Sequence, residues 1–189
     1  AEFVTTLREL SGGKPIGMKL CVGRPEEIAA LVRAFVEFGP EAAPDFITVD
    51  GAEGGTGAAP PEFQDSVGMP LAEGLRLVDS MLTGAGLRDR VTLIASGKVY
   101  NGFSLVRALA LGADLCNSAR GMMFALGCIQ ALKCNSNHCP TGITTHLPEL
   151  ESGLDVPSKA RRVANFQRAT VHAAQEIIKR TSVDEVWQM

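Results

Sequence analysis

The chain has 189 residues, enough for one domain with a sizeable core, and it carries 18 Lys and Arg against 21 Asp and Glu. A formal net charge of −3 gives no support for a nucleic-acid partner or for an anionic membrane surface. The apolar runs are far shorter than the ~20 residues that cross a bilayer. Five cysteines, an odd number, do not resemble a secreted disulfide scaffold, so we expect reduced thiols and a cytoplasmic location.

Short apolar runs typical of strands alternate along the chain with longer stretches of helical periodicity. The first strand-like run is IGMKLCV at residues 16–22, and a helical pattern follows at 25–38. Later strands are predicted at 45–50, 91–96 and 113–118, and helices near 70–83, at 102–111, from about 121 and at 158–180. Strands that are apolar throughout and separated by helices predict an α/β fold with a parallel sheet buried on both faces.

Four such βα units fit either a small doubly wound sheet or half of an eight-stranded β/α barrel. Every strand ends in polar or glycine-rich residues: Lys19, then GAEGGTGA, then SGK, then NSARG. Because barrel enzymes build their active sites at the C-terminal strand ends, this pattern favours the barrel. We therefore predict a partial TIM (β/α)8 barrel over residues 1–150 and a C-terminal helical extension over 151–189.

The ends of the third and fourth predicted strands resemble a phosphate site. Small residues there let backbone N–H groups approach a phosphate, and the next helix adds its positive N-terminus. The predicted contacts are Ser96, Gly97, Lys98, Ser118, Ala119, Arg120 and Gly121. Flavin barrels hold phosphate after strands seven and eight, which would make this chain the C-terminal half of the barrel. The alternative is two ordinary turns with capping serines.

Lys19 and the glycine-rich loop at residues 50–57 are further candidates. A lysine inside an apolar strand is unusual, and on an inward-facing position Lys19 could reach a flavin ring or a carboxylate substrate. The alternative is a strand-end lysine that extends to solvent. Gly55, Thr56 and Glu53 are candidate flavin or substrate contacts in the loop, although the loop could also be a simple turn or lid.

Three cysteines lie close together as Cys128-x5-Cys134-x4-Cys139. Such spacing is compatible with a disulfide framework, zinc, an iron–sulfur cluster or chance. Three ligands suit a cluster with three iron corners, whereas structural zinc usually takes a fourth protein ligand. His138 could be that fourth ligand, but its adjacency to Cys139 makes the two side chains diverge.

With these motifs in place, nearly the whole chain resembles the flavin domain of glutamate synthases. The resemblance rests on GGTGA at residues 54–58, A-L-x-L-G-A at 108–113 and G-C-x5-C-x4-C-P-x-G-I at 127–143. It implies FMN at the C-terminal mouth of the barrel, with its phosphate on the two turns. It also implies that the three cysteines hold a [3Fe-4S] cluster, and that Lys19 lies near the flavin and 2-oxoglutarate.

The resemblance further implies an oxidoreductase acting on CH-NH2 donors. Electrons from a donor protein or an NAD(P)H-oxidising subunit would pass through the cluster to FMN, and a hydride would convert 2-iminoglutarate to L-glutamate. We expect a fragment, inactive alone, that needs the other barrel half or self-association. The alternatives are a different FMN-dependent barrel oxidoreductase, or a non-catalytic fragment whose cysteines bind zinc or no metal.

Overall fold

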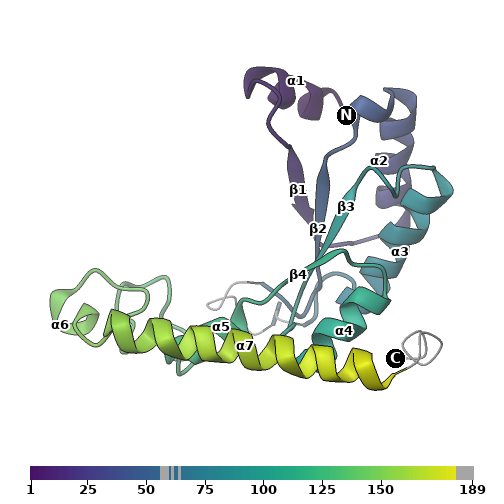
Figure 1. Ribbon diagram of the computed structural model, residues 1–189. Helices are drawn as coiled ribbons and strands as arrows, with labels where there is room; N and C mark the ends of the chain where they lie inside the picture. Colours follow the sequence, from purple (N-terminus) through teal and green to yellow (C-terminus); the bar gives the residue numbers. More distant parts are fainter. Residues whose placement is uncertain (56–59, 61, 64, 182–189) are drawn as a thin grey trace.

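The computed structural model describes residues 1–55, 60, 62–63 and 65–181. Its centre is a parallel four-stranded sheet in the order β1-β2-β3-β4 (Figure 1). The strands are β1 (Gly17–Leu20), β2 (Phe46–Asp50), β3 (Thr92–Ser96) and β4 (Leu115–Asn117). The helices are α1 (Glu2–Leu10), α2 (Pro25–Glu37), the 3-10 turn η1 (Pro40–Ala42), α3 (Leu71–Gly84), α4 (Gly102–Ala110), α5 (Arg120–Leu126), α6 (Pro148–Glu151) and α7 (Val156–Arg180).

The alternation of strands and helices confirms the α/β prediction. Helices α2 and α3 lie along one face of the sheet, and their apolar side chains form the core with alternate strand residues (Figure 1). The strand contribution to this core includes Ile47 and Val49 of β2 and Leu93 and Ala95 of β3. Sequential strands that pair in parallel with a crossover helix between them are the repeating unit of a β/α barrel.

The other face of the sheet corresponds to the barrel interior. Because parallel strands in register point aligned residues to the same side, this face is built in rows. The rows are Gly17, Phe46 and Thr92; then Lys19, Thr48, Ile94 and Leu115; then Asp50, Ser96 and Asn117. A side chain at Gly17 would clash with the Phe46 ring, so glycine lets that ring lie across β1. The last row, at the C-terminal strand ends, is entirely polar.

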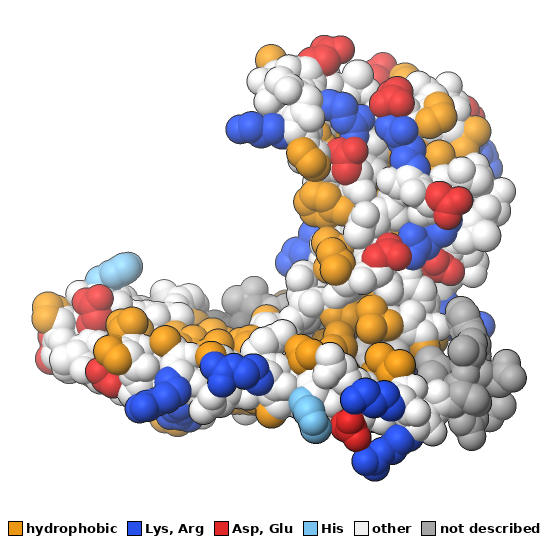
Figure 2. All heavy atoms as spheres, in the orientation of Figure 1, with side chains coloured by type: hydrophobic (Ala, Val, Ile, Leu, Met, Phe, Trp, Pro, Cys, Tyr) orange, Lys and Arg blue, Asp and Glu red, His pale blue; other side chains and the backbone are white. Residues whose placement is uncertain are grey.

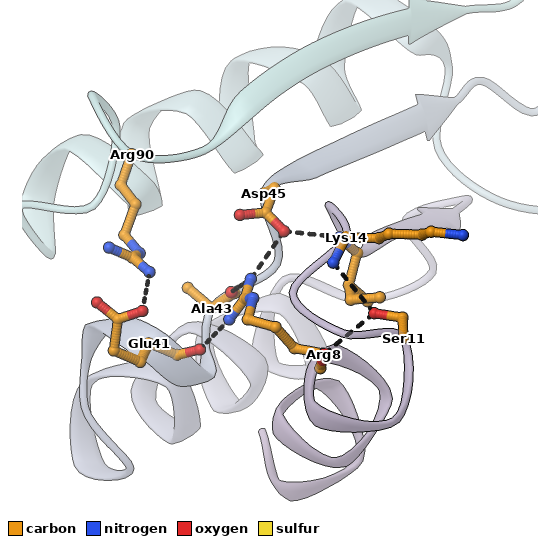
Figure 3. Close-up of polar contacts among 8 residues, drawn as sticks. Arg8, Ser11, Lys14, Glu41, Ala43, Asp45 and Arg90 are labelled. Carbon is orange, nitrogen blue, oxygen red and sulfur yellow. Dashed lines mark hydrogen bonds and ion pairs between the residues drawn. The ribbon is translucent and has the colours of Figure 1, made fainter.

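The opposite end of the sheet is fixed by ion pairs (Figure 3). Arg8 of α1 pairs with Asp45 just before β2, with Nη2 and Oδ2 2.8 Å apart, and Asp45 also accepts the N–H of Ile16. Burial would raise the pKa of Asp45, but these hydrogen bonds outweigh it and lower the pKa. Arg90 pairs with Glu41 of η1 at 2.8 Å. Helix α1, which the hydrophobic pattern did not predict, is thereby tied to the sheet.

Helix α7 runs across the molecule and packs against α4 and α5 (Figure 1). A side chain at Gly102 would lie 2.6 Å from the backbone nitrogen of Ala174, so the two helices approach closely at that glycine. Asp155 caps the start of α7 by accepting the N–H of Ser158 at 3.1 Å. The helix is present as predicted, while the domain boundary at residue 150 stays a prediction. No helix in the described part of the chain could cross a membrane.

Candidate functional site

All four strand ends meet at one cavity of about 250 Å³ at the C-terminal edge of the sheet. The predicted residues that line it are Lys19, Glu53, Gly55, Ser96, Gly97, Lys98, Ala119 and Arg120. Four further residues line it without having been predicted as contacts: Asp50, Gly54, Val99 and Asn117. Residues far apart in the chain are therefore brought together as the strand-end pattern predicted.

Two predicted residues that the structure describes, Ser118 and Gly121, are not among the lining. They lie next to it in the chain, and a side chain at Gly121 would be 3.2 Å from Ser118 Oγ. Ser118 Oγ is buried and has no hydrogen-bond partner among the described residues. A buried hydroxyl without a partner is costly, so it is available for an incoming polar group. Thr56 lies outside the described residues.

The Ser96-Gly97-Lys98 turn has a fixed backbone. Gly97 has a φ of +142°, and a side chain there would lie 3.3 Å from the backbone nitrogen of Gly51. That Gly51 nitrogen donates to Ser96 O at 2.7 Å, which joins this turn to the end of β2. Lys98 follows with a left-handed φ of +48°. The turn therefore depends on the close approach of two backbone segments, as a phosphate-binding turn requires.

Three cations line the cavity, and they differ in how they are paired. Lys98 Nζ lies 2.7 Å from Asp65, and both side chains are more than half exposed, so this pair can exchange with solvent or ligand. Lys19 Nζ lies 3.1 Å from Asp50 Oδ2. Arg120, half-buried at the start of α5, has no ion pair within the described ranges. Arg120 is thus the cation most available to an anionic ligand.

Glu53 has a structural partner that its position in the loop did not suggest. Its two carboxylate oxygens lie 3.0 and 3.1 Å from the N–H of Leu71, the first residue of α3. A side chain at Gly51 would clash with this carboxylate and lie 2.6 Å from the Leu71 nitrogen. Glu53 therefore caps α3 while forming part of the cavity wall.

A second cavity of about 370 Å³ adjoins the first and shares four lining residues with it. The shared residues are Glu53, Gly54, Lys98 and Arg120. Tyr100, Phe124 and Gln130 extend the wall towards the cysteine segment. The sequence did not single out these three residues, because nothing in their spacing marks them and they meet only in the folded chain.

The cysteine segment follows α5 as predicted, but its thiols are not assembled into a site. Cys128 and Cys139 are half-buried and Cys134 is exposed, and all three are free. Among the described residues, no group of three His, Cys, Asp or Glu side chains is arranged to hold a metal ion. A hydrogen bond with Thr141 is the main cause that lowers the pKa of Cys139, to about 6. A thiolate is the form that binds metals, so this shift is compatible with a ligand role.

The fold and cavity together define the chain as part of a β/α barrel with a polar, cationic mouth. The family model described as the conserved region in glutamate synthase matches residues 1–184. This chain belongs to the glutamate synthase family, a family of oxidoreductases. The family prediction made from the three motifs is therefore confirmed.

Curated relatives agree with this assignment. The chain is 47% identical over 165 residues to the glutamate synthase large subunit-like protein YerD of Bacillus subtilis, which covers 87% of this chain and 31% of that protein. It is 39% identical over 142 residues to the archaeal glutamate synthase [NADPH] of Methanocaldococcus jannaschii, which covers 75% of this chain and 28% of that one. The chain thus spans about a third of the length of these relatives.

A solved structure supports the fold alone. The L230A mutant of flavocytochrome b2 with benzoylformate superposes with a TM-score of 0.54 at 16% identity, over 96% of this chain and 36% of that one. The match extends over nearly all of this chain. The predicted partial-barrel fold class is confirmed.

Proposed function

We propose that this chain is the C-terminal part of an FMN-binding barrel in a glutamate synthase-type oxidoreductase. The reaction is the reduction of 2-iminoglutarate, formed from 2-oxoglutarate and ammonia, to L-glutamate. The observation that carries the proposal is the convergence of all four strand ends on one cavity with three cations. Family membership and the NADPH-linked names of the relatives support a redox role. When bound, FMN supplies the two-electron hydride chemistry.

The residues at the third and fourth strand ends fit the phosphate group of FMN. Arg120 is free to pair with a phosphate oxygen, and Lys98 can do so by leaving its exposed pair with Asp65. The fixed backbone at Gly97 permits close approach, and the unpartnered Ser118 hydroxyl is a further donor nearby. Together they would hold the phosphate end, while the adjoining cavities leave room for the rest of the cofactor.

Lys19 is the contact that we propose for the substrate and the flavin. It projects from the inner face of β1, and its side chain is 65% exposed to the cavity mouth and solvent. In the proposed reaction it binds a substrate carboxylate and stabilises negative charge beside the reacting atoms. The exposed position of the Lys19 side chain also avoids the cost of burying its charge in the core.

The [3Fe-4S] cluster is supported by the spacing of the three cysteines, not by their arrangement. Because the thiols are not gathered in the described structure, the residues as they lie do not fit the cluster. No step of the proposed reaction is therefore assigned to it. The ligand roles of Cys128, Cys134 and Cys139 stay a prediction, with zinc or no metal as the alternatives.

The exposed inner face of the sheet supports the proposal that another polypeptide segment covers it. Leu115 on β4 is 56% exposed, and hydrophobic side chains gather on the concave side of the molecule where the sheet meets the α7 arm (Figure 2). Within the described chain, β1 and β4 each have only one paired edge. Open edges and apolar patches favour association. The other barrel half, or a second copy, would cover them, and an electron-donor protein or NAD(P)H-oxidising subunit would complete the reaction.

The proposal is tested with the full-length protein loaded with FMN and chemically reduced under anaerobic conditions. Addition of 2-oxoglutarate with ammonium is expected to reoxidise the flavin and to yield one L-glutamate per flavin. A Lys19→Met variant is expected to slow reoxidation at least tenfold while it retains FMN. Reduced flavin that stays reduced in the wild-type protein, with no glutamate formed, would contradict the proposal.

A further inference from the structure

Gln130 of the cysteine segment, residues 128–139, lines the second cavity together with both cations of the proposed phosphate site, Lys98 and Arg120. It lies two residues after Cys128, and its backbone N–H donates to the Cys128 sulfur at 3.4 Å. A ligand whose phosphate pairs with the two cations is therefore adjacent to a residue of the cysteine segment. Neither the phosphate turns nor the cysteine spacing predicted that the two motifs would share a cavity wall.

Helix α5 connects the phosphate site to the cysteine segment. Arg120 is its first residue, and Phe124, four residues later on the same side of the helix, lines the second cavity as well. Gly127 ends the helix with a left-handed φ of +111°, and the N–H of Cys128 donates to Met123 O at 2.9 Å. One wall of the cavity therefore runs from a cation through an aromatic ring to the start of the cysteine segment.

Packing against α7 holds α5 in place along its length. A side chain at Gly121 would lie 3.0 Å from the Phe166 ring, and one at Gly127 would lie 2.8 Å from Lys159 Nζ. Both partners belong to α7, which packs against α5. A ligand in the second cavity thus meets a fixed helix, and the part of the chain that can respond is the segment beyond Gly127.

The first part of that segment, residues 129–136, has few buried contacts within the described structure. All of its residues are exposed, including the apolar Ile129 and Leu132, which are 66% and 48% exposed. Gln130 and Leu132 also have left-handed φ values of +54° and +55°, which are unfavourable for residues other than glycine. Segments with few buried contacts open at a small cost in free energy, so one added contact changes their stability measurably.

The second part of the segment is anchored by the chain itself. Thr145 Oγ1 donates to Asn137 O at 2.6 Å, and Asn137 Oδ1 accepts the N–H of His146 at 2.7 Å. Thr145 is buried, and Cys139 Sγ lies 3.3 Å from Thr141 Oγ1. Ordering that depends on a ligand is therefore expected before Asn137 and not after it.

We propose that Gln130 contacts the bound cofactor and that occupation of the phosphate site thereby orders residues 129–136. The inference rests on the proposed function in one respect, the pairing of the FMN phosphate with Lys98 and Arg120. It adds a second role for that site, because a cofactor that orders this part of the chain also fixes the position of Cys134. By linkage, whatever holds the segment ordered raises the affinity for the cofactor by the same factor.

The test compares amide hydrogen exchange of the full-length protein without flavin and with saturating FMN, at equal metal content. We expect the amides of residues 129–136 to exchange about tenfold more slowly with FMN, and those of 139–147 to stay the same. Trypsin gives a second readout, since Lys133 is the only lysine or arginine between Arg120 and Lys159. Cleavage after Lys133 should slow by a similar factor.

Gln130→Ala should lose the protection of residues 129–136 at saturating FMN, with an affinity for FMN lowered by about the same tenfold, while its flavin-free exchange stays at the wild-type rate. Faster exchange of Gln130→Ala in both states would show a merely structural role and overturn the inference. Gln175→Ala, which removes an exposed amide of α7, is the matched control and should keep full protection. Phe124→Leu is a second variant of the cavity wall and should reduce the protection.

Equal exchange of residues 129–136 with and without FMN in the wild-type protein would overturn the inference, as would full protection in Gln130→Ala. If Gln130→Ala does not fold, the wild-type comparison and Phe124→Leu decide. Flavin reoxidation by 2-oxoglutarate and ammonium without protection would overturn this inference and leave the proposed function standing. Protection by FMN that Gln130→Ala abolishes, without any reoxidation, would support the contact and contradict the reaction.

Discussion

The carboxylate of Glu53 accepts a hydrogen bond from the backbone N–H of Leu71, 18 residues further along the chain, at 3.0 Å. The residue that precedes α3 is Pro70, whose side chain cannot accept a hydrogen bond from the helix. Glu53 therefore supplies the cap from a distance, and its negative charge interacts favourably with the helix N-terminus. The loop after β2 and the start of α3 are fixed to each other at the cavity wall.

Replacement of Glu53 by alanine should lower the free energy of unfolding by about 1 kcal/mol, because the first turn of α3 loses its acceptor. Urea denaturation of the full-length protein measures this, and amide hydrogen exchange should show faster exchange at Leu71. Glu62→Ala, which removes an exposed acid of the same loop, should change neither. An unchanged exchange rate at Leu71 in Glu53→Ala would show that the cap is not formed.

Arg88 joins α3 to the N-terminal ends of β3 and β4. Its guanidinium pairs with Asp79 at 2.6 Å and Asp114 at 3.0 Å, and donates to the carbonyl oxygens of Val91 and Gly112. Arg88→Ala should cost about 2 kcal/mol in urea denaturation, since these groups lose their donor. Most of this loss comes from Asp79 and the carbonyl groups, because Asp114 is 43% exposed and screened by solvent.

The same variant should change the response to acid. Burial would raise the pKa of Asp114, but the hydrogen bonds from Arg88 and the Leu93 N–H outweigh it and lower the pKa below the ordinary 3.8. The resulting stability is present above pH 3.8 and is lost as the pH falls through the lower, folded-state pKa. Arg88→Ala should therefore lose less stability below pH 4 than the wild type, whereas Arg33→Ala, on the exposed side of α2, should match the wild type. Parallel acid curves for Arg88→Ala and wild type would contradict this account.

Gly97 and Gly84 give a matched pair of glycine substitutions. Gly97→Ala should cost about 1–3 kcal/mol and weaken FMN binding, because a φ of +142° is strained for alanine and the new methyl group would press on Gly51. Gly84 is the last residue of α3, and a side chain there would meet open space. Gly84→Ala should therefore be neutral or stabilising by up to about 1 kcal/mol. Thermal unfolding and flavin fluorescence titration measure both effects. Equal behaviour of the two variants would show that the turn carries no special strain.

The sequence predicted the strands, the order of βα units and most of the cavity lining, because period, turn residues and strand-end polarity are local properties. Eight of the predicted residues meet at one cavity. Helix α1 was missed because it is held by the long-range Arg8–Asp45 pair, which no local pattern records. The contacts of Glu53 and Asp50 depend on partners 18 and 31 residues away, so only the folded chain could reveal them.

The cysteine prediction is open to a direct metal analysis. The [3Fe-4S] prediction made from the sequence requires that the full-length protein, purified without oxygen, contain iron and acid-labile sulfide, and that Cys134→Ser lose both. Cys21→Ser is the control, since Cys21 lies at the end of β1 and outside the clustered segment. Stoichiometric zinc without iron would favour the zinc alternative. The absence of both iron and zinc from the wild-type protein would favour a non-catalytic segment.

The central claim is that Lys98 and Arg120 bind the phosphate of FMN at the third and fourth strand ends. The most direct measurement compares the affinities of the flavin-free, full-length protein for FMN and for riboflavin, which lacks the phosphate. We predict that FMN binds at least a hundredfold more tightly than riboflavin. Arg120→Ala should weaken FMN binding at least tenfold and leave riboflavin binding unchanged. Equal affinities of the wild-type protein for FMN and riboflavin would contradict the account.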